Sequence, residues 1–556
     1  MKTIKFSIII ALFSVIVCGC SKKSATTYPH LVAVPQNAAI VLSLNAKQIV
    51  EKAGLDNMEQ YKCNPLIQKE IENEPAEERK IMKDFMKDTR TSGLNLDNIF
   101  FYLLNGNNAA YDDVPNFSFG VTFKIDNVKT FESFLEKVNL SYDAEDKKVY
   151  LDNGISLQWN DEIAIITNAD ENGTDIFNKD ESKSILANEL FKNEYSDKND
   201  VYLYGEYNFL INIAETMSYY AGYGADQAAL SELDLYKDMS LSISLNAEKG
   251  EFVATGKMLP VEKTAEIFGK FYKSDFNNDL YKYISDKSLI ALKCAIKPLD
   301  IYNYYKKTLG IGQTEESTET TTEEVEVLDE DGNVIDKEEV IVDKYRGYTS
   351  NYNLAMKMMV EQYDAKITSV LENFTGDFIG SLSGLTNFSP DFAVAAGIVE
   401  GKENDVTALI EQAGFVKNTD GYYLKNINTI NLYFAVNKNA ACLAGTPEAI
   451  ANFLDNGYSS DITSAKDFGE ELKDASSYFY LNLNINDYPS ILKVMLGMSS
   501  EGKMAMPLLE KLKSINGSAT KTNGFELKLK FTENDYASKI LLKGIDELLS
   551  QYLELK

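Results

Sequence analysis

The sequence of 556 residues contains a single histidine, His30. Ser-His-Asp triads, Cys-His pairs and histidine-ligated metal sites all need a well-placed histidine, and we expect His30 to lie in an N-terminal tether. The chain also lacks a glycine-rich phosphate loop followed by Lys-Ser or Lys-Thr, a paired-cysteine motif and a dinucleotide-binding fingerprint. These absences predict no conventional catalytic residue, no cofactor and no metal site.

Cysteine is also scarce. Beyond Cys20 the chain has only Cys63, Cys294 and Cys442, and they are widely spaced. An odd number of scattered cysteines gives no disulfide framework, so at most one bridge can form and lone buried thiols fit the pattern better.

Positive charge is in short supply, with 55 basic residues against 84 acidic ones and a net charge of −29. Such a charge argues against nucleic acid as a partner and against a body that lies flat on anionic lipid. Hydrophobic residues nevertheless make up 44% of the chain and aromatic residues 11%. The composition is therefore that of a folded protein with large cores.

The N-terminus has the features of a secretory signal. Lys2 and Lys5 precede an apolar stretch, Ile8 to Val17, which is too short for the roughly 20 residues of a transmembrane helix. The following Val17-Cys18-Gly19-Cys20 resembles the bacterial lipobox. The resemblance implies cleavage after residue 19, lipidation of Cys20 and a tether over residues 20–30; an ordinary signal peptide with an incidental Cys20 is the alternative.

The rest of the chain resembles itself. A strand and an amphipathic helix that begin at Pro115 recur 275 residues later, at Pro390. A hairpin that begins at Ile155 recurs at Ile430, also 275 residues later, and downstream of it the offset becomes 277. We therefore predict an α+β fold of two tandem duplicated units, 31–280 and 281–556, each with a mostly antiparallel sheet and helices packed on one face. Chance similarity between strand-rich halves is the alternative.

An acidic insertion, 313–344, separates the first strand of the second unit from the rest. It has 13 carboxylates and two lysines. Two alternating stretches around Asp331-Gly332 predict a solvated or protruding hairpin. Asp329, Asp331 and Asn333 alternate as calcium ligands do, but the EF-hand spacing is absent, so a solvated hairpin fits better than a weak cation site.

Two groups of residues are candidates for a binding surface. Tyr202, Tyr204 and Tyr207 alternate along one predicted strand, and Met356 and Met359 lie in a helical segment. Tyrosines make rigid contact surfaces and methionines adaptable apolar ones. Packing inside the sheet or the core explains the same patterns.

A family resemblance is carried by the lipobox, by Val34-Pro35-Gln36-Asn37-Ala38-Ala39 before a strand and by Glu51-Lys52-Ala53-Gly54-Leu55 at a helix end. With the repeated α+β body, these resemble Bacteroides-type lipoproteins of the family called domain of unknown function 4836. The resemblance spans nearly the whole mature chain and supplies no catalytic residue. Surface-displayed lipoproteins of such bacteria resemble one another in acidic residues after the lipidated cysteine. The basic stretch 21–25 here favours the periplasmic face of the outer membrane.

We therefore expect a lipid-anchored binding or interaction protein of the cell envelope, with binding favoured over enzyme activity. Its duplicated sheet surfaces would meet a protein, a glycan or a lipid. Two alternatives stay open: a carboxylate-dependent polysaccharide hydrolase, which needs only a pair of acidic residues, and a periplasmic holdase that uses the methionine-rich helices.

Overall fold

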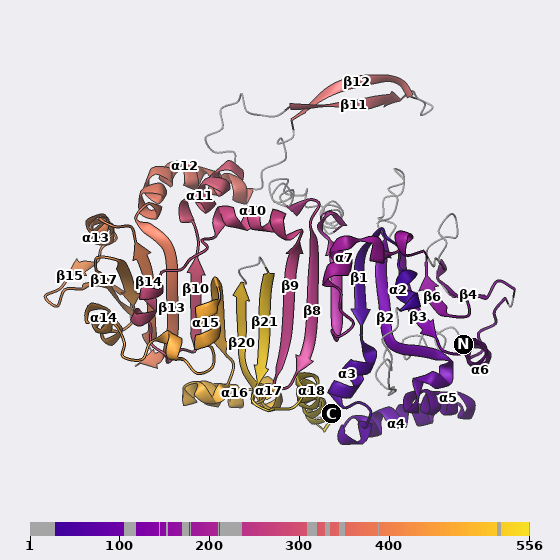
Figure 1. Ribbon diagram of the computed structural model, residues 1–556. Coiled ribbons are helices and arrows are strands. Elements are labelled where there is room, and N and C mark those ends of the chain that lie inside the picture. The colour runs from indigo at the N-terminus through magenta and orange to yellow at the C-terminus, as the bar shows by residue number, and fades with distance from the viewer. Residues whose placement is uncertain are drawn as a thin grey trace.

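The computed structural model describes residues 28–554 except 105–117, 144, 152–153, 169–176, 178–179, 210, 212–235, 309–319, 329–333, 344–350, 387–388, 429 and 520–523. The signal segment, Cys20 and the residues Asp329, Asp331 and Asn333 lie outside the described part. The fold is α+β, as predicted, and its centre is one antiparallel sheet (Figure 1).

Nineteen strands form this sheet. In spatial order they are β4 (Lys148–Tyr150), β5 (Ser156–Trp159), β6 (Ile163–Thr167), β3 (Ser118–Ile125), β2 (Leu94–Leu104), β1 (Ala38–Leu44), β7 (Val201–Glu206), β8 (Ser240–Glu248), β9 (Glu251–Leu259), β21 (Gly524–Phe531), β20 (Leu512–Ala519), β19 (Ser477–Asn482), β10 (Ile290–Ala295), β13 (Phe374–Thr386), β14 (Ser389–Ile398), β18 (Ala440–Ala444), β17 (Ile430–Val436), β16 (Tyr423–Ile427) and β15 (Val416–Lys417).

The helices fall into groups by their place around the sheet (Figure 1). One face carries α2 (Pro29–Val32), α7 (Glu189–Glu194), α14 (Pro447–Leu454) and α15 (Gly469–Asp474). One edge, at the top of the view, carries α10 (Val261–Phe271), α11 (Pro298–Thr308) and α12 (Asn351–Leu371). The opposite edge carries α3 (Ala46–Ala53), α4 (Asn64–Asn73), α5 (Ala76–Lys87), α16 (Ser490–Met498), α17 (Ser500–Leu509) and α18 (Ala537–Glu554).

The prediction that helices pack on one face of the sheet holds for only part of it. At its two ends, α6 (Val128–Lys137) and α13 (Glu403–Gln412) pack on the opposite face. There the helix residues Phe131 and Val406 bury the strand residues Phe123 and Phe434. The two ends of the sheet thus have helices on both sides. In its middle, α18 packs at one edge on the same side as α6 and α13, where its residues Ala537 and Ile540 cluster with Leu529 and Phe531 of β21.

Local sequence explains the element boundaries. The Asn45 side chain accepts a hydrogen bond from the Gln48 backbone N–H at 3.1 Å and so caps the start of α3, whose end is marked by Gly54 at a φ of +68°. The Asn127 side chain caps α6 by accepting from the Thr130 N–H at 3.0 Å. These capping residues mark the starts of two amphipathic helices.

The two halves of the sheet have the same strand order. β10 pairs with β13 and β19 as β1 pairs with β2 and β7. The halves join where β9 pairs with β21, with Ala254 opposite Leu527. A duplication would produce this arrangement, although the duplication itself stays a prediction.

Side-chain contacts also recur between the halves. The Phe191 ring lies 5.8 Å from Tyr202 and 5.7 Å from Tyr204 between centroids. In the second half, Phe468 lies 6.3 Å from Tyr478 and 4.1 Å from Tyr480. In each half an aromatic side chain from the segment before the strand therefore packs on two alternate tyrosines of that strand.

Three details of the sequence prediction can be compared with the described structure. His30 lies in α2 with 1% of its surface exposed, so the packed body begins before Leu31. The insertion contains β11 (Thr320–Leu328) and β12 (Val334–Asp343), which pair as a hairpin in a sheet of their own. Cys63, Cys294 and Cys442 are free thiols.

Candidate binding surface

The central strands alternate between polar and apolar residues. β8 reads Ser-Leu-Ser-Ile-Ser-Leu-Asn from residue 240, and β21 reads Phe-Glu-Leu-Lys-Leu-Lys-Phe from residue 525. Successive side chains of a strand point to opposite faces, so one face of the sheet is polar here and the other apolar. Such alternation is typical of a strand whose apolar face is buried against a core.

The strand register joins the apolar positions into one row across eleven strands. Its members are Leu44, Val201, Leu245, Ala254, Leu527, Gly517, Phe479, Leu292, Gly380, Val394 and Leu443. No member of this row has a charged or hydrogen-bonding side chain. The row crosses the junction between the two halves without interruption.

Large apolar side chains remain exposed along this row and the two rows beside it. We call the following six residues the apolar face, and each has between 37% and 56% of its surface exposed: Ile290, Leu292, Val394, Phe479, Phe525 and Leu527. Scattered apolar residues on a surface are common, but a contiguous patch marks an interaction site more often than not. The centre of the sheet therefore presents apolar side chains to solvent where the sequence pattern predicts burial.

Glycines make the apolar face continuous. A Cβ atom at Gly517 would overlap the Phe479 ring, and a Cβ atom at Gly256 would overlap the Phe525 ring. Phe479 is the register partner of Gly517, and Phe525 is the partner of Gly256. Because each ring lies over the glycine of the neighbouring strand, the rings bridge adjacent strands and leave a broad surface.

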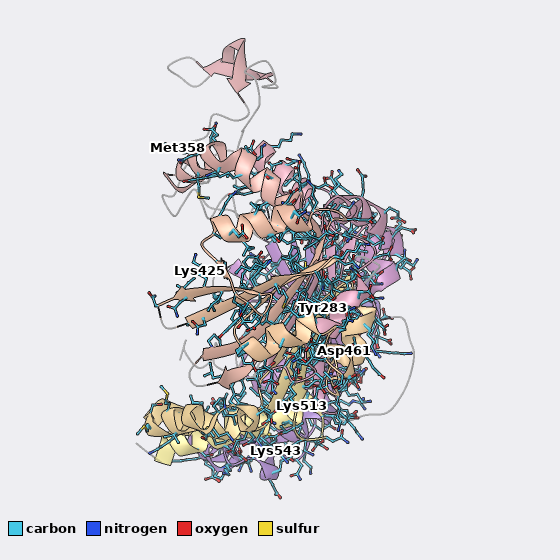
Figure 2. The ribbon with its side chains drawn as sticks, turned by 90° about the vertical axis from the view of Figure 1, so that its left-hand side faces the viewer. Tyr283, Met358, Lys425, Asp461, Lys513 and Lys543 are labelled. Atoms are coloured by element: carbon cyan, nitrogen blue, oxygen red, sulfur yellow. The ribbon has the colours of Figure 1, made fainter. Side chains whose placement is uncertain are left out.

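Helices extend past the sheet on the side of the apolar face. We call the opposite face, which carries α2, α7, α14 and α15, the covered face. In Figure 2, Tyr283 and Asp461 mark the covered face on the right, while α12 at the top and α16 to α18 at the bottom extend to the left. Met358 and Met359 on α12 and Met495 and Met498 on α16 are exposed. The apolar face thus lies between two helical edges that carry flexible, polarizable side chains.

The covered face has a different chemistry. The Lys293 side chain is buried, and its Nζ donates to the carbonyl oxygens of Leu472 at 2.9 Å and Ala475 at 2.6 Å, at the end of α15. Its neighbour in β10 is Leu292, the most exposed residue of the apolar face. Two consecutive residues of one strand therefore have opposite environments: Lys293 is buried with hydrogen-bond partners, and Leu292 is an apolar side chain exposed to solvent.

Glu471 of α15 is a second charged group on the covered face. Its carboxylate lies 2.9 Å from the Lys530 Nζ and accepts a hydrogen bond from the Asn516 Nδ2 at 2.8 Å. Burial by itself would raise the pKa of Glu471, but the hydrogen bonds from Lys530 and Asn516 and the nearby positive charge lower it to about 2. This carboxylate is held in its ionised form by a structural network, which is not the environment of a general acid.

The residues proposed from sequence are dispersed. Tyr202 and Tyr204 are buried beneath α7, where Tyr202 accepts a hydrogen bond from Ser242 and Tyr204 is bonded to Ser240. Tyr207 is half-buried, and its ring stacks on Tyr236 with centroids 5.4 Å apart. The two buried tyrosines are packing residues, because no partner could reach them at the surface.

The two candidate methionines also differ from the apolar face. Met359 is exposed on α12, and the side chain of Met356 lies outside the described part of the structure. None of the six residues of the apolar face was predicted from the sequence. The alternation of β21 marked Phe525 and Leu527 as members of an apolar side, but an alternating strand predicts a buried side and gives no sign that it stays uncovered. The other four residues lie on β10, β14 and β19, which do not show such alternation.

The described residues include neither a candidate metal site nor a candidate membrane-spanning helix. No group of three or more His, Cys, Asp or Glu side chains is placed there to hold a metal ion. No described helix has the length and hydropathy to span a membrane.

Comparison with known proteins gives one family. The model of the family described as "Domain of unknown function (DUF4836)" matches residues 31–538. No curated protein matches the chain significantly. Crystal forms I and III of TP0453 are 12% identical to it with a TM-score of 0.21, and the matches cover 42% and 45% of this chain and 80% and 88% of TP0453. At that TM-score the likeness has no bearing on function.

Proposed function

The chain belongs to the DUF4836 family of unknown function, and we propose that it is a binding protein which holds an apolar ligand on the apolar face. One observation carries this proposal. The face has six large apolar side chains in three adjacent rows that span strands β21 to β14, and all of them are more than a third exposed. Burial of such side chains contributes about 25 cal/mol per Å² of apolar surface removed from water, which supplies the affinity.

The chemistry of the face favours binding over hydrolysis. A glycoside hydrolase needs two carboxyl groups within about 10 Å that flank the scissile bond. The row that contains Leu292 and Phe479 has no acidic residue at any of its eleven positions. The partly buried carboxylate of Glu471 faces the other side of the sheet and forms ion pairs with two lysines, Lys528 and Lys530.

The proposal includes the location predicted from the N-terminal sequence. Lipidation at Cys20 would anchor the body in the cell envelope, at the periplasmic face of the outer membrane. Metabolic labelling with an alkyne-tagged fatty acid tests the anchor: the wild-type chain should be labelled and Cys20→Ala should not. Labelling of Cys20→Ala at the wild-type level would contradict this part of the proposal.

Binding at the apolar face can be tested with a neutral apolar fluorophore such as N-phenyl-1-naphthylamine. We expect saturable fluorescence enhancement with the full mature chain, and an affinity at least fivefold weaker in Leu292→Gln/Leu527→Gln. The matched control is Leu66→Gln, because Leu66 is 45% exposed on α4, outside the apolar face. Equal affinity of the double variant and the control would refute the proposal.

A holdase is the second candidate, and exposed methionines on both helical edges favour it. Met358, Met359, Met495 and Met498 could adapt to unfolded client chains. In that case, suppression of client aggregation should be lost in Met358→Gln/Met359→Gln and kept in Leu292→Gln/Leu527→Gln. The opposite pattern favours ligand binding at the apolar face.

A further inference from the structure

We propose that the ligand of the apolar face is a zwitterionic two-chain phospholipid, whose acyl chains lie across strands β21 to β14. This inference rests on the proposed function and adds the identity of the ligand. Three properties of the face lead to it: its lack of hydrogen-bonding groups, its dimensions and the charge of the chain around it.

The first property is the absence of polar groups that could recognise a peptide or a glycan. β10 is paired with β13 and β19, and β19 with β20, so their backbone N–H and C=O groups are already used on both sides. A peptide that binds by strand addition needs a free sheet edge, and a glycan needs donors and acceptors. The side chains of Leu292, Phe479 and Leu527 offer only hydrocarbon, so the ligand must be hydrocarbon over most of its contact.

The second property is size. The exposed part of the main row runs from Leu527 on β21 to Val394 on β14, over six strands. Neighbouring strands are about 4.8 Å apart, so this part is about 24 Å long. A bilayer has a hydrocarbon core of about 30 Å, so one leaflet, and hence one acyl chain, spans about 15 Å. An extended acyl chain fits along the row.

The face is also wide enough for two chains. Phe525, Leu527 and Ile290 lie in three adjacent rows of the same face, and only toward β21 is the row of Ile290 covered, where Leu529 packs on α18. Rows on one face are separated by two residues, about 6.7 Å, which gives a width of about 13 Å. Packed apolar groups approach to about 4 Å between carbon atoms, so a second chain can lie beside the first. A single fatty acid would leave part of the face exposed.

The third property is charge. The chain has a net charge of −29, which opposes the approach of net-anionic lipids and of a second copy of the same chain. A zwitterionic phospholipid carries no net charge and avoids this repulsion. The charge of the chain therefore favours a zwitterionic lipid over an anionic lipid or a second copy, and the width of the face favours two acyl chains.

The test is transfer of phosphatidylethanolamine from vesicles to the full mature chain, followed by gel filtration and measurement of phosphorus per chain. We expect about one lipid per chain for wild type and for Leu66→Gln, and at least a fivefold loss for Leu292→Gln/Leu527→Gln. Circular dichroism and the thermal midpoint verify that the double variant is folded. Parallel arms use phosphatidylglycerol vesicles and oleic acid, for which we expect at least fivefold lower occupancy.

The outcomes separate the two proposals. If the neutral fluorophore binds at the apolar face but phosphatidylethanolamine does not displace it, the lipid assignment is wrong and the binding function stands. The lipid assignment is equally wrong if oleic acid or phosphatidylglycerol displaces the fluorophore better. A wild-type dimer in light scattering that becomes monomeric in the double variant would assign the face to a second copy. If the fluorophore itself fails to bind, both proposals fall.

Discussion

The two faces of strand β19 show how differently one sheet is used. Tyr478 and Tyr480 point to the covered face, where each is 3% exposed and packs on Phe468. Phe479, which lies between them, points to the apolar face and is 40% exposed. Three consecutive aromatic residues therefore have opposite environments, because helix α15 and the segment before it lie on only one side. Residue type alone does not decide burial.

The polar groups of the sheet differ in the same way. On the covered face, Lys293 and Glu471 are surrounded by hydrogen-bonding partners. On the apolar face, Ile290, Leu292 and Leu527 have no polar group to satisfy. The charged groups of the covered face are therefore satisfied within the protein, whereas the apolar face is the surface that the proposed ligand would cover.

The largest expected contrast is between two phenylalanines. Phe468→Ala should cost about 3–5 kcal/mol of unfolding free energy, because it empties a buried site beside Tyr480. Phe479→Ala should cost about 1 kcal/mol, because the ring is already partly in water. Chemical denaturation of the two variants measures the difference. Equal losses would mean that the two faces are equally covered in solution.

Lys293→Met should be the next most damaging change on the covered face. It removes the donor to three backbone carbonyls, those of Leu472, Lys473 and Ala475. Leaving buried carbonyls without a donor should cost about 2–3 kcal/mol. Lys425→Met is the control, since the Lys425 Nζ donates to one exposed carbonyl, that of Ala413. A similar, small loss for both variants would contradict a structural role for Lys293.

His30 makes the covered face sensitive to acid. Burial lowers the pKa of His30 to about 3, although a hydrogen bond to the Asn98 carbonyl, 2.9 Å from Nε2, opposes the shift. In the unfolded chain its pKa is about 6.5. Because only the unfolded state takes up the proton, stability is full above pH 6.5 and falls progressively as the pH drops toward 3.

At pH 5 the expected loss from His30 is about 2 kcal/mol relative to pH 7.5. Unfolding curves at the two pH values measure it, with His30→Gln as the comparison. The variant should lose much less between these pH values, because His30 is the single histidine of the chain. An identical loss in the variant would assign the acid sensitivity to other groups.

Glu471 should act at lower pH and more weakly. Its pKa is about 2 in the folded protein and about 4.5 when unfolded, so its contribution is full above pH 4.5 and is lost as the pH falls toward 2. Allowing for its partial exposure to solvent, we expect about 1 kcal/mol between pH 5 and pH 3. Glu471→Gln should flatten the stability curve in that window, and an unchanged curve in this variant would assign the acid sensitivity to other groups.

The smallest expected effect is on the apolar face itself. Leu292→Gln should change the stability by less than about 0.5 kcal/mol, because the side chain is already 56% exposed. Ala291→Gln, one residue earlier on the fully buried side of β10, should cost several times more through overpacking. Thermal midpoints of the two variants provide the comparison. A large loss for Leu292→Gln would show that this face is covered in the free protein.

Much of the fold followed from the sequence pattern. The hairpins that begin at Ile155 and Ile430 were predicted, and in their turns the side chains of Asn160 and Asn437 accept hydrogen bonds from backbone N–H groups. The acidic hairpin was predicted too, and β11 and β12 form it. These features depend on neighbours in the chain, which a single sequence contains. The burial of the candidate tyrosines was less predictable, because it depends on α7 folding back over β7 so that Phe191 packs on Tyr202 and Tyr204.

The sequence by itself determined which residues share a face of each strand, because side chains alternate along every extended segment. It thereby placed Phe525 and Leu527 on the apolar side of β21. Only the tertiary structure decided that this side is left open, that β9 pairs with β21 to continue the sheet through both halves, and that His30 is buried in the core. The physical reason is that burial depends on which distant segment packs against a face, and alternation carries no information about that segment.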